Sequence, residues 1–529
     1  MNYYPTLSRS LIGTALSILL SFSAFALIAA PPAQRPNILF IAVDDLKPEM
    51  GCYGNQLIRT PRIDRLAEQG TLFLQAYCQQ AVCAPSRASI MTGMRPDFTK
   101  VWDLQTQMRD MQPDILTLPA YFRSQGYLTA GIGKIFDYRA VDAGQDTPSW
   151  SVPFFQVEPS YYHEQRPPAL HWYQSPENRA RAEELLQEAA AKGLERPQAI
   201  SYAHGFLKPS VESADVPDDA YFDGAMTKKA VEIMGRLAQQ EAPFFFAVGY
   251  HRPHLPFTAP DKYWDLYRRE EMPLAVFRQK SAGGPPVAYH NSGELRSYTD
   301  IPPLAGTPGM GDHIGLPIEK QRELIHGYYA AVSYIDAQIG MLLDRLRELQ
   351  LHENTVIVLW GDHGWHLGDH DLWCKHSNFE QATRSPLIIS APGMKTGKSG
   401  SVVEFVDVFP TLCELAGLQL PAHLHGVSLA PVMRNKKTEV KKFAMSQYPR
   451  GGAIMGYTLR TERYRYTCWL GEDFRSDQPY RPEMLRAGEL YDYRRDPLET
   501  KNLFEDPGYR RVRKKLEGLL SDFFAGQRQ

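Results

Sequence analysis

The sequence is short of cysteine, carries no excess of charge of either sign and contains no internal repeat or long low-complexity tract. Its 58 Lys and Arg residues nearly balance 60 Asp and Glu residues, which gives a formal net charge of −2. Whole-chain electrostatics therefore give no reason to expect binding to nucleic acid or to an anionic membrane, and any attraction for an anionic substrate must be local. The few cysteines lack the short repeated spacing of a disulfide framework or a zinc cluster. They are Cys52, Cys78, Cys83, Cys374, Cys413 and Cys468.

Long apolar runs are also scarce, and the longest lies near the N-terminus. Arg9 precedes the apolar residues 11–28, and Ala24-Phe25-Ala26 is a small-x-small cleavage pattern ahead of Pro31-Pro32. This order is typical of a secretory signal peptide, which we place at residues 1–30. The run approaches the length of a membrane span, so an N-terminal anchor is the alternative. We expect an exported protein, periplasmic or secreted, with no stable membrane insertion after signal cleavage.

The stretch Cys83-Ala84-Pro85-Ser86-Arg87 carries the most distinctive chemistry in the chain. A lone cysteine is usually a buried thiol. However, the guanidinium of Arg87 is always charged and would favour a thiolate or another anion beside it. Residues 88–92 follow as candidate first turns of a helix, and helix N-termini attract anions. The stretch therefore predicts a reactive group at an anion-binding helix start.

Acidic residues follow two buried-strand patterns. Residues 37–43 and 355–360 are continuous apolar runs, which are typical of strands in a parallel sheet. The first run is followed by Asp44-Asp45, and the second by Gly361 and then Asp362-His363. Ligands of open α/β sheets gather beyond the carboxyl ends of the strands, where adjacent carboxylates are costly unless paired or bound to metal. Two such strand ends can converge on one hard divalent cation.

Together with Thr92-Gly93, the pattern Cys-x-Pro-Ser-Arg resembles the signature of the type I sulfatases, and Gln80-Ala81-Val82 before it is similar to their iduronate-2-sulfatase branch. The resemblance runs from about Pro36 to the C-terminal region. It implies an α/β sandwich of the alkaline phosphatase type, with a large, mostly parallel mixed sheet flanked by helices and a smaller C-terminal antiparallel sheet. It also implies that a formylglycine-generating maturation enzyme oxidises Cys83 to formylglycine, the aldehyde that becomes the nucleophile.

The same resemblance implies a metal site at the two strand ends. The cation would be calcium, with magnesium as the alternative. Position 363 is commonly Asn in arylsulfatases, whereas Asp-His is the pattern of the iduronate-2-sulfatase branch, and imidazole is an unusual calcium ligand. The implied ligands are Asp44, Asp45, the modified side chain at Cys83, Asp362 and His363.

Further blocks resemble the family's catalytic segments. Lys134 and Lys375 match lysines that contact the sulfate, and with Arg87 they would supply positive charge to the transition state. His251 matches a histidine that contacts the sulfate or the leaving group, and we expect it to protonate the leaving oxygen, with Lys375 as a helper. The hydrated aldehyde would attack sulfur, and elimination of sulfate would restore the aldehyde. The implied catalytic residues are Cys83, Arg87, Lys134, Asp137, His251 and Lys375.

Asp137 is a departure from the family pattern. The iduronate-2-sulfatase branch reads Lys-x-x-His from the position of Lys134, and this chain has Asp137 where that histidine would be. By position, Asp137 is the candidate base for the release of sulfate. The alternative is that Asp137 pairs with a lysine or arginine and that His254 or His366 serves as the base.

At 529 residues the chain is long enough for a large core and two packed units. The polar, basic segment 434–442 is the expected link between a catalytic domain, residues 35–435, and a C-terminal subdomain, residues 440–529.

The remaining patterns predict local structure. Apolar residues recur every three or four positions over residues 321–350, which predicts one amphipathic helix. Residues 456–460 and 464–469 alternate like antiparallel strands. Residues 145–220 are less regular. We expect ordinary surface packing for most of this segment, with an insertion that lines the substrate entrance as the alternative, and assign no site residue to it.

These observations predict hydrolysis of a sulfate ester on a sulfated oligo- or polysaccharide, and the resemblance favours a 2-sulfated uronic acid. Three alternatives stay open. They are a phosphonate or phosphodiester hydrolase of the same superfamily, a non-catalytic sulfated-glycan-binding protein that keeps Cys83 as a thiol, and a zinc-dependent phosphatase.

Overall fold

A computed structural model describes residues 35–170, 172–304, 314–471 and 482–526. The predicted signal segment, residues 1–30, lies outside the described residues. Among the helices that are described, none is both long enough and apolar enough to cross a membrane.

A seven-stranded mixed sheet forms the centre of the molecule, in the order β11-β2-β10-β7-β1-β5-β3. Strands β7, β1, β5 and β3 are parallel neighbours, and only β10 runs antiparallel to both strands beside it. The strands are β1 (Asn37–Val43), β2 (Thr71–Tyr77), β3 (Leu128–Gly133), β5 (Phe244–Tyr250), β7 (Thr355–Gly361), β10 (Leu387–Ser390) and β11 (Gly397–Glu404). The two predicted buried strands, β1 and β7, thus lie side by side.

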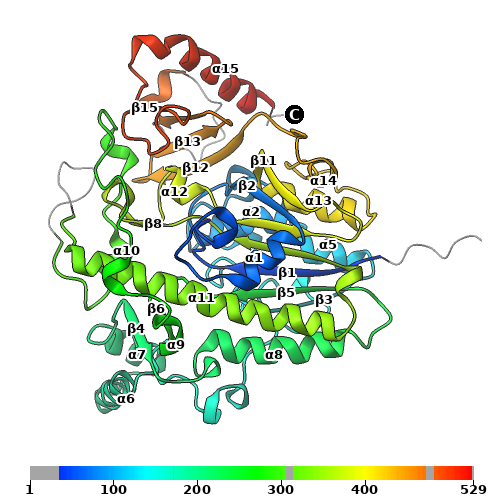
Figure 1. The fold of residues 1–529 in the computed structure, drawn as a ribbon, viewed down its shortest axis with the longest axis vertical. Coiled ribbons are helices and arrows are strands. Elements are labelled where there is room, and N and C mark those ends of the chain that lie inside the picture. The colour runs from blue at the N-terminus through cyan, green and yellow to red at the C-terminus, as the bar shows by residue number, and fades with distance from the viewer. Residues whose placement is uncertain (1–34, 171, 305–313, 472–481, 527–529) are drawn as a thin grey trace, which may run out of the picture. The chain divides into compact units, whose positions relative to one another are not determined.

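Both faces of this sheet are covered by helices, because the central strands are apolar on both sides (Figure 1). In β1, Leu39, Ile41 and Val43 pack on the side of α1 (Pro61–Glu68), α8 (Phe222–Leu237) and α11 (Ile318–Glu348). The alternate residues Ile38, Phe40 and Ala42 pack on the other side. The helices there are α2 (Cys83–Thr92), α5 (Leu118–Ser124), α13 (Val408–Leu415) and α14 (Ala430–Arg434). Helix α11 confirms the helix predicted over residues 321–350.

A four-stranded antiparallel sheet follows in the C-terminal part of the chain, in the order β12-β13-β14-β15. Its strands are β12 (Ala444–Arg450), β13 (Ile454–Arg460), β14 (Tyr464–Leu470) and β15 (Leu485–Asp492), and helix α15 (Arg510–Gly526) packs on it through Leu516 and Leu520. The two antiparallel strands predicted here are confirmed as β13 and β14. The predicted limits of the two parts of the chain, 35–435 and 440–529, stay a prediction.

The less regular segment, residues 145–220, contains two helices and a strand that were not predicted. This segment contains α6 (Pro176–Ala191), α7 (Arg196–His204) and β4 (Val211–Ala214), which pairs with β6 (Phe257–Pro260). The signal for α6 was present, because Ser175 caps the helix by accepting from the N–H of Asn178 and Pro176 occupies its first turn.

The remaining elements are short and shape the loops at the sheet edges. They are α3 (Pro96–Thr99), α4 (Met108–Met111), α9 (Asp261–Trp264), α10 (Gly293–Arg296), α12 (Glu380–Thr383), β8 (His366–Leu367) and β9 (Trp373–Cys374).

Candidate active site

The carboxyl ends of four neighbouring parallel strands deliver most of the predicted site residues to one edge of the sheet. Asp44 and Asp45 follow β1, and the pair Asp362-His363 follows β7. Lys134 follows β3 and His251 follows β5. Because these strands are parallel and adjacent, residues more than 300 positions apart in sequence meet at this edge.

Three carboxylates, an imidazole and a thiol form one buried cluster. The side-chain donor atoms of Asp44, Cys83 and Asp362 lie within 4.8 Å of one another, and so do those of Asp45, Cys83 and His363. Nε2 of His363 is 3.4 Å from Oδ1 of Asp45 and 3.6 Å from Oδ2 of Asp362. All five predicted metal ligands are thus brought together, and none is more than 1% exposed.

The charges in this cluster fit a hard divalent cation. Burial raises the pKa of Asp45 well above its ordinary range; the charge of Lys375 opposes this, and the nearby carboxylates of Asp44, Glu294 and Asp362 reinforce it. Asp45 also has φ 58°, in the left-handed region, and its N–H donates to Oδ1 of Asp362 at 3.0 Å. A strained residue that holds a carboxylate against others is a hallmark of a functional site. Oxygen-rich donor sets of this kind suit calcium or magnesium better than zinc.

Arg87 organises the cluster from the first turns of α2. Its Nε donates to Oδ2 of Asp362 at 3.0 Å, and its Nη2 donates to Oδ1 of Asp44 at 3.1 Å. Its Nη1 donates to the backbone oxygens of Lys134 and Ile135. The guanidinium is fully buried, so Arg87 holds two carboxylates and the end of β3 in place.

Cys83 stands at the start of α2, which begins five residues earlier than the turns predicted from residue 88. Its Sγ is 3.4 Å from Oδ1 of Asp44 and 3.5 Å from Nε2 of His363. Burial raises the pKa of the thiol well above its ordinary value, and the charge of Asp44 acts in the same direction. Of the two expected partners of Arg87, a thiolate or another anion, the structure has the second, because the guanidinium is bound to the carboxylates of Asp44 and Asp362. An unmodified Cys83 would be a protonated, weak nucleophile.

Two lysines project into the cluster from opposite sides. Nζ of Lys134 is 2.5 Å from Oδ2 of Asp44, and Nζ of Lys375 is 2.9 Å from Oδ1 of Asp45. Burial opposes the charge of both ammonium groups, but the neighbouring carboxylates raise the pKa of each. Both lysines are therefore charged at neutral pH. Lys375 also donates to Oε1 of Glu294 at 3.1 Å.

His251 and His254 lie beside this cluster. Nδ1 of His251 is 3.7 Å from Oδ1 of Asp223, an ion-pair distance too long for a hydrogen bond. Nε2 of His254 is 3.2 Å from Oε1 of Glu294 and 3.9 Å from Oδ2 of Asp45. Burial lowers the pKa of both histidines, so both are neutral at neutral pH.

Asp137 is buried but faces Arg139. Nε of Arg139 donates to its Oδ1 at 2.8 Å, and Nη2 donates to its Oδ2 at 2.7 Å. Burial opposes ionisation, but the hydrogen bonds from Arg139 and the charge of Lys134 lower the pKa of Asp137. Asp137 therefore pairs with an arginine, as the alternative prediction had it, and its catalytic role stays a prediction. His366 lies apart and bonds to Ser377 Oγ at 2.8 Å.

A cavity of about 810 Å³ opens onto the cluster through Asp44, Lys134, His251 and His254. Several lining residues, and the groups that hold the histidines, were not among the predicted site residues. They are Tyr138, Arg139, Trp172, Tyr173, Lys208, Arg252 and Tyr298 in the wall, with Asp223 and Glu294 behind. The ring of Trp172 is 5.0 Å from that of His251 and lies 4.3 Å from the guanidinium carbon of Arg252. The segment to which no site residue was assigned thus supplies one wall of the cavity.

Comparison with family models identifies two matches. A model described as Sulfatase matches residues 36–418, and a model described as N-sulphoglucosamine sulphohydrolase, C-terminal, matches residues 368–525. Among curated proteins, iduronate 2-sulfatase of Homo sapiens is 35% identical over 535 residues, covering 89% of this chain and 91% of that protein. The Delta 4,5-hexuronate-2-O-sulfatase of Bacteroides thetaiotaomicron is 23% identical over 514 residues, covering 94% of this chain and 90% of that protein.

Solved structures share the fold. One, in complex with its substrate D-glucosamine-2-N,6-O-disulfate, has a TM-score of 0.67 at 23% identity and covers 93% of this chain and 97% of that chain. The phosphonate monoester hydrolase of Agrobacterium radiobacter also has a TM-score of 0.67 at 23% identity, covering 94% of this chain and 96% of that chain. The predicted α/β class, with its large mixed sheet and small antiparallel sheet, is confirmed.

Proposed function

Since the chain belongs to the sulfatase family and is a sulfuric ester hydrolase, we propose that it removes the 2-O-sulfate of a uronic acid residue in a sulfated oligo- or polysaccharide. The resemblance read from Cys83 to Thr92-Gly93 is confirmed at the level of the family. The observation that carries the substrate proposal is the 35% identity with human iduronate 2-sulfatase over most of both chains. We further propose that residues 1–30 are a signal peptide and that the protein acts in the periplasm or outside the cell.

The cavity supports a substrate with a second negative group. A 2-sulfated uronic acid has a carboxylate as well as a sulfate, and the cavity wall holds Lys208 in addition to Lys134. Nζ of Lys208 donates to Ser297 Oγ at 2.8 Å and lies 4.5 Å from the centre of the Tyr298 ring. Burial lowers the pKa of Lys208, so a carboxylate partner would stabilise its charge. We assign Lys208 to the uronate carboxylate.

Formylglycine made from Cys83 would supply the nucleophile, as is general in the family. The buried thiol with its raised pKa supports a need for conversion, because a protonated thiol attacks poorly. The expected partner is a formylglycine-generating maturation enzyme. Mass spectrometry of the Cys83 peptide tests this, and an unmodified thiol in fully active enzyme would reject it.

A divalent cation, which we propose to be calcium, would be held by Asp44, Asp45, Asp362 and His363 and by the side chain at position 83. When bound, it supplies positive charge against the anionic sulfate oxygens. The ammonium groups of Lys134 and Lys375 face the same point from two sides and add further positive charge. Arg87 holds the carboxylates of Asp44 and Asp362 in position. Four of its five N–H groups donate to protein oxygens, so one N–H of Nη2 is left for a contact with the substrate.

Proton transfer needs an acid for the leaving oxygen and a base for the release of sulfate. We propose His251 as the acid, because it lines the cavity beside Lys134. Burial disfavours its imidazolium form in the free protein, and the charge of Asp223 together with that of a bound anionic sulfate would favour it. Lys375 is its proposed helper. Asp137 stays the proposed base, and His254, held by Glu294, is the competing candidate.

A panel of defined sulfated disaccharides, with an aryl sulfate and a phosphonate monoester beside them, tests the proposal. The enzyme should prefer the 2-sulfated uronate, with kcat/KM above that for the other sulfated positions. Lys208→Gln should raise KM for that substrate at least tenfold and leave KM for the aryl sulfate unaffected, since only the 2-sulfated uronate has a carboxylate in addition to its sulfate. Equal loss on both substrates would reject the assignment of Lys208, and preference for the phosphonate would reject the sulfate-ester proposal.

A further inference from the structure

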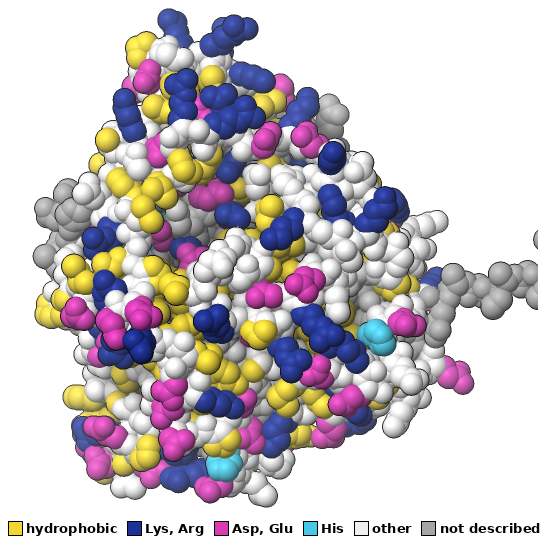
Figure 2. All heavy atoms as spheres, viewed as in Figure 1, with side chains coloured by type: hydrophobic (Ala, Val, Ile, Leu, Met, Phe, Trp, Pro, Cys, Tyr) yellow, Lys and Arg dark blue, Asp and Glu magenta, His cyan; other side chains and the backbone are white. Residues whose placement is uncertain are grey.

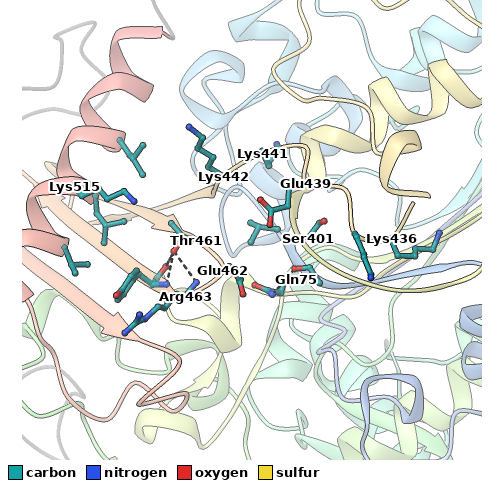
Figure 3. Close-up of a pocket in the computed structure, with 17 residues that line it drawn as sticks. Gln75, Ser401, Lys436, Glu439, Lys441, Lys442, Thr461, Glu462, Arg463 and Lys515 are labelled. Atoms are coloured by element: carbon teal, nitrogen blue, oxygen red, sulfur yellow. Dashed lines mark hydrogen bonds between the residues drawn. The ribbon is translucent and has the colours of Figure 1, made fainter. Parts of the chain in front are cut away.

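A second large cleft lies on the C-terminal side of the molecule, away from the active-site cavity. It has a volume of about 820 Å³ and shares no lining residue with that cavity. Its walls come from β2 and β11, from the segment 436–442, from the turn between β13 and β14, and from α15. Figure 3 shows these residues around a hollow, with α15 on one side and Lys436 on the other.

Basic side chains dominate the charged groups of this cleft. Six lysine or arginine residues line it, against two glutamates. In Figure 2 the basic side chains gather over the same C-terminal part of the molecule. The basic residues are Lys436, Lys437, Lys441, Lys442, Arg463 and Lys515, and the acidic ones are Glu439 and Glu462. This concentration stands out because the whole chain has a net charge of only −2.

Half of the basic groups hold the walls together. Nζ of Lys436 donates to the backbone oxygens of Lys395 and Met433 at 2.7 and 2.6 Å, and to Thr71 Oγ1 at 2.8 Å. Lys441 pairs with Glu404 and Asp407, each at 2.6 Å. Arg463 pairs with Asp492 at 2.6 Å. These groups fix the shape of the cleft and leave little charge for a ligand.

The other three, Lys437, Lys442 and Lys515, are exposed, and their ammonium groups have no partner within the described part of the chain. The carboxylate of Glu462 forms an ion pair with Arg494, with 3.7 Å between Oε1 and Nη2. Only Glu439 remains as an opposing charge in the wall. The cleft therefore presents a surplus of uncompensated positive charge, which attracts an anion at ordinary ionic strength.

Helix α15 strengthens this field at some cost to its own stability. Its first turns carry exposed basic residues, Arg510, Arg511 and Lys514, ahead of Lys515. Cations at a helix N-terminus are unfavourable, because the helix dipole is positive there. This arrangement of cations destabilises the helix but favours the binding of an anionic ligand.

We propose that this cleft is a second binding site for a sulfated polysaccharide chain, which holds the polymer while the active site removes a sulfate elsewhere on it. The polymer class rests on the proposed function. The volume suits several sugar units rather than a single ion. Val512 and Leu519, which are half-buried, give the cleft apolar surface for the faces of sugar rings. Sites for single-stranded nucleic acid use aromatic stacking platforms, and the lining of the cleft has only Tyr464, which lies against the guanidinium of Arg463 at 4.8 Å.

The binding test uses the full chain with Cys83→Ala, so that nothing is turned over. In that background, Lys437→Gln, Lys442→Gln and Lys515→Gln are combined, and the Kd for a fluorescently labelled heparin oligosaccharide is measured at several salt concentrations. The triple variant should bind about 3- to 100-fold more weakly, since each exposed charge contributes a factor of about 1.5 to 5 and the three factors multiply. The slope of log Kd against log salt should fall by about 2.

A matched control removes the same number of charges elsewhere. Lys192→Gln, Lys228→Gln and Lys262→Gln replace three exposed lysines outside the cleft, and their combination should leave Kd within a factor of about two. Equal weakening by the two triple variants would overturn the proposal. So would single-stranded DNA binding to the cleft as tightly as the heparin oligosaccharide at the same salt concentration.

An activity test separates this proposal from the proposed function. With Cys83 intact, the cleft triple should raise KM for a sulfated polymer about tenfold and leave turnover of a 2-sulfated disaccharide unchanged. If the disaccharide is not a substrate of either protein, the proposed function fails while the Kd comparison still decides the cleft. If polymer and disaccharide respond alike to the triple variant, the cleft proposal fails.

Discussion

Replacing Arg87 with methionine tests whether this residue builds the active site or acts on the substrate. The guanidinium is fully buried and donates to Asp44, Asp362 and two backbone carbonyl oxygens. Methionine fills similar space but leaves two buried carboxylates without that partner. Removing one member of a buried ion pair costs about 3–5 kcal/mol, because the remaining charge stays buried. Arg87→Met should therefore destabilise the metal-free protein by about that amount.

The melting temperature gives the readout. At about 2.1 cal/mol/K per residue, the described residues have an unfolding entropy of about 1 kcal/mol/K, so the loss corresponds to about 3–5 °C. The shift should be measured in a chelator and again in excess calcium, where the cation replaces part of the missing charge and the loss should shrink. Calcium affinity should fall at least tenfold, since Asp44 and Asp362 lose their common anchor. Arg87→Lys keeps the charge but reaches fewer partners. Its melting temperature and calcium affinity should lie between those of the wild type and those of Arg87→Met.

The reasoning would be refuted by an Arg87→Met protein with the wild-type melting temperature in chelator, wild-type calcium affinity and a loss confined to kcat. That result would mean that the guanidinium acts on the transition state, as the sequence pattern alone suggested.

Three further predictions concern separate parts of the chain. Asp137→Asn should complete one sulfate transfer and then stall, because an amide cannot accept the proton; a burst followed by slow turnover measures this, with Asp137→His as the matched variant that turns over. Unchanged steady-state turnover in Asp137→Asn would contradict a catalytic role and would assign Asp137 a structural role, its ion pair with Arg139. Chelation should abolish activity and calcium should restore it, and stoichiometric zinc by elemental analysis, together with activity in Asp45→Ala, would contradict the proposed site. Glu499→Gln should destabilise the protein at neutral pH by about 3 kcal/mol. Burial opposes the charge of Glu499, but Arg465 and hydrogen bonds lower its pKa from 4.5 to about 2. The contribution of Glu499 to the free energy of unfolding is thus fully present above about pH 4.5 and is lost as the pH falls to about 2. Denaturant unfolding of both proteins across that range should converge at the acid end, and a constant difference would contradict the assignment.

Much of the architecture follows from local sequence pattern. The runs that became β1 and β7 are apolar after their first residues, Asn37 and Thr355, as a strand covered on both faces requires. The apolar periodicity predicted α11, although the helix is buried at every position from Leu324 to Asp336. The acidic pairs directly after β1 and β7 could be placed together because parallel strands end at the same edge. Helix α6 was not predicted, although Ser175 and Pro176 are residues typical of a helix start.

The sequence by itself determined which chemical groups the site contains: a cysteine at a helix start, two acidic strand ends and two lysines. The partners of those groups were decided only by the tertiary structure. Lys375 donates to Asp45, 330 positions away, and both Lys375 and His254 contact Glu294. Arg87 donates to carboxylates, and Asp137 pairs with Arg139. These pairings depend on how close two side chains come after packing, and on which carboxylate or ammonium each buried charge must find to offset its desolvation. Apart from the pair Asp137 and Arg139, which lie two residues apart, no local pattern encodes these choices, because they are made by residues that lie far apart in sequence until the sheet has formed.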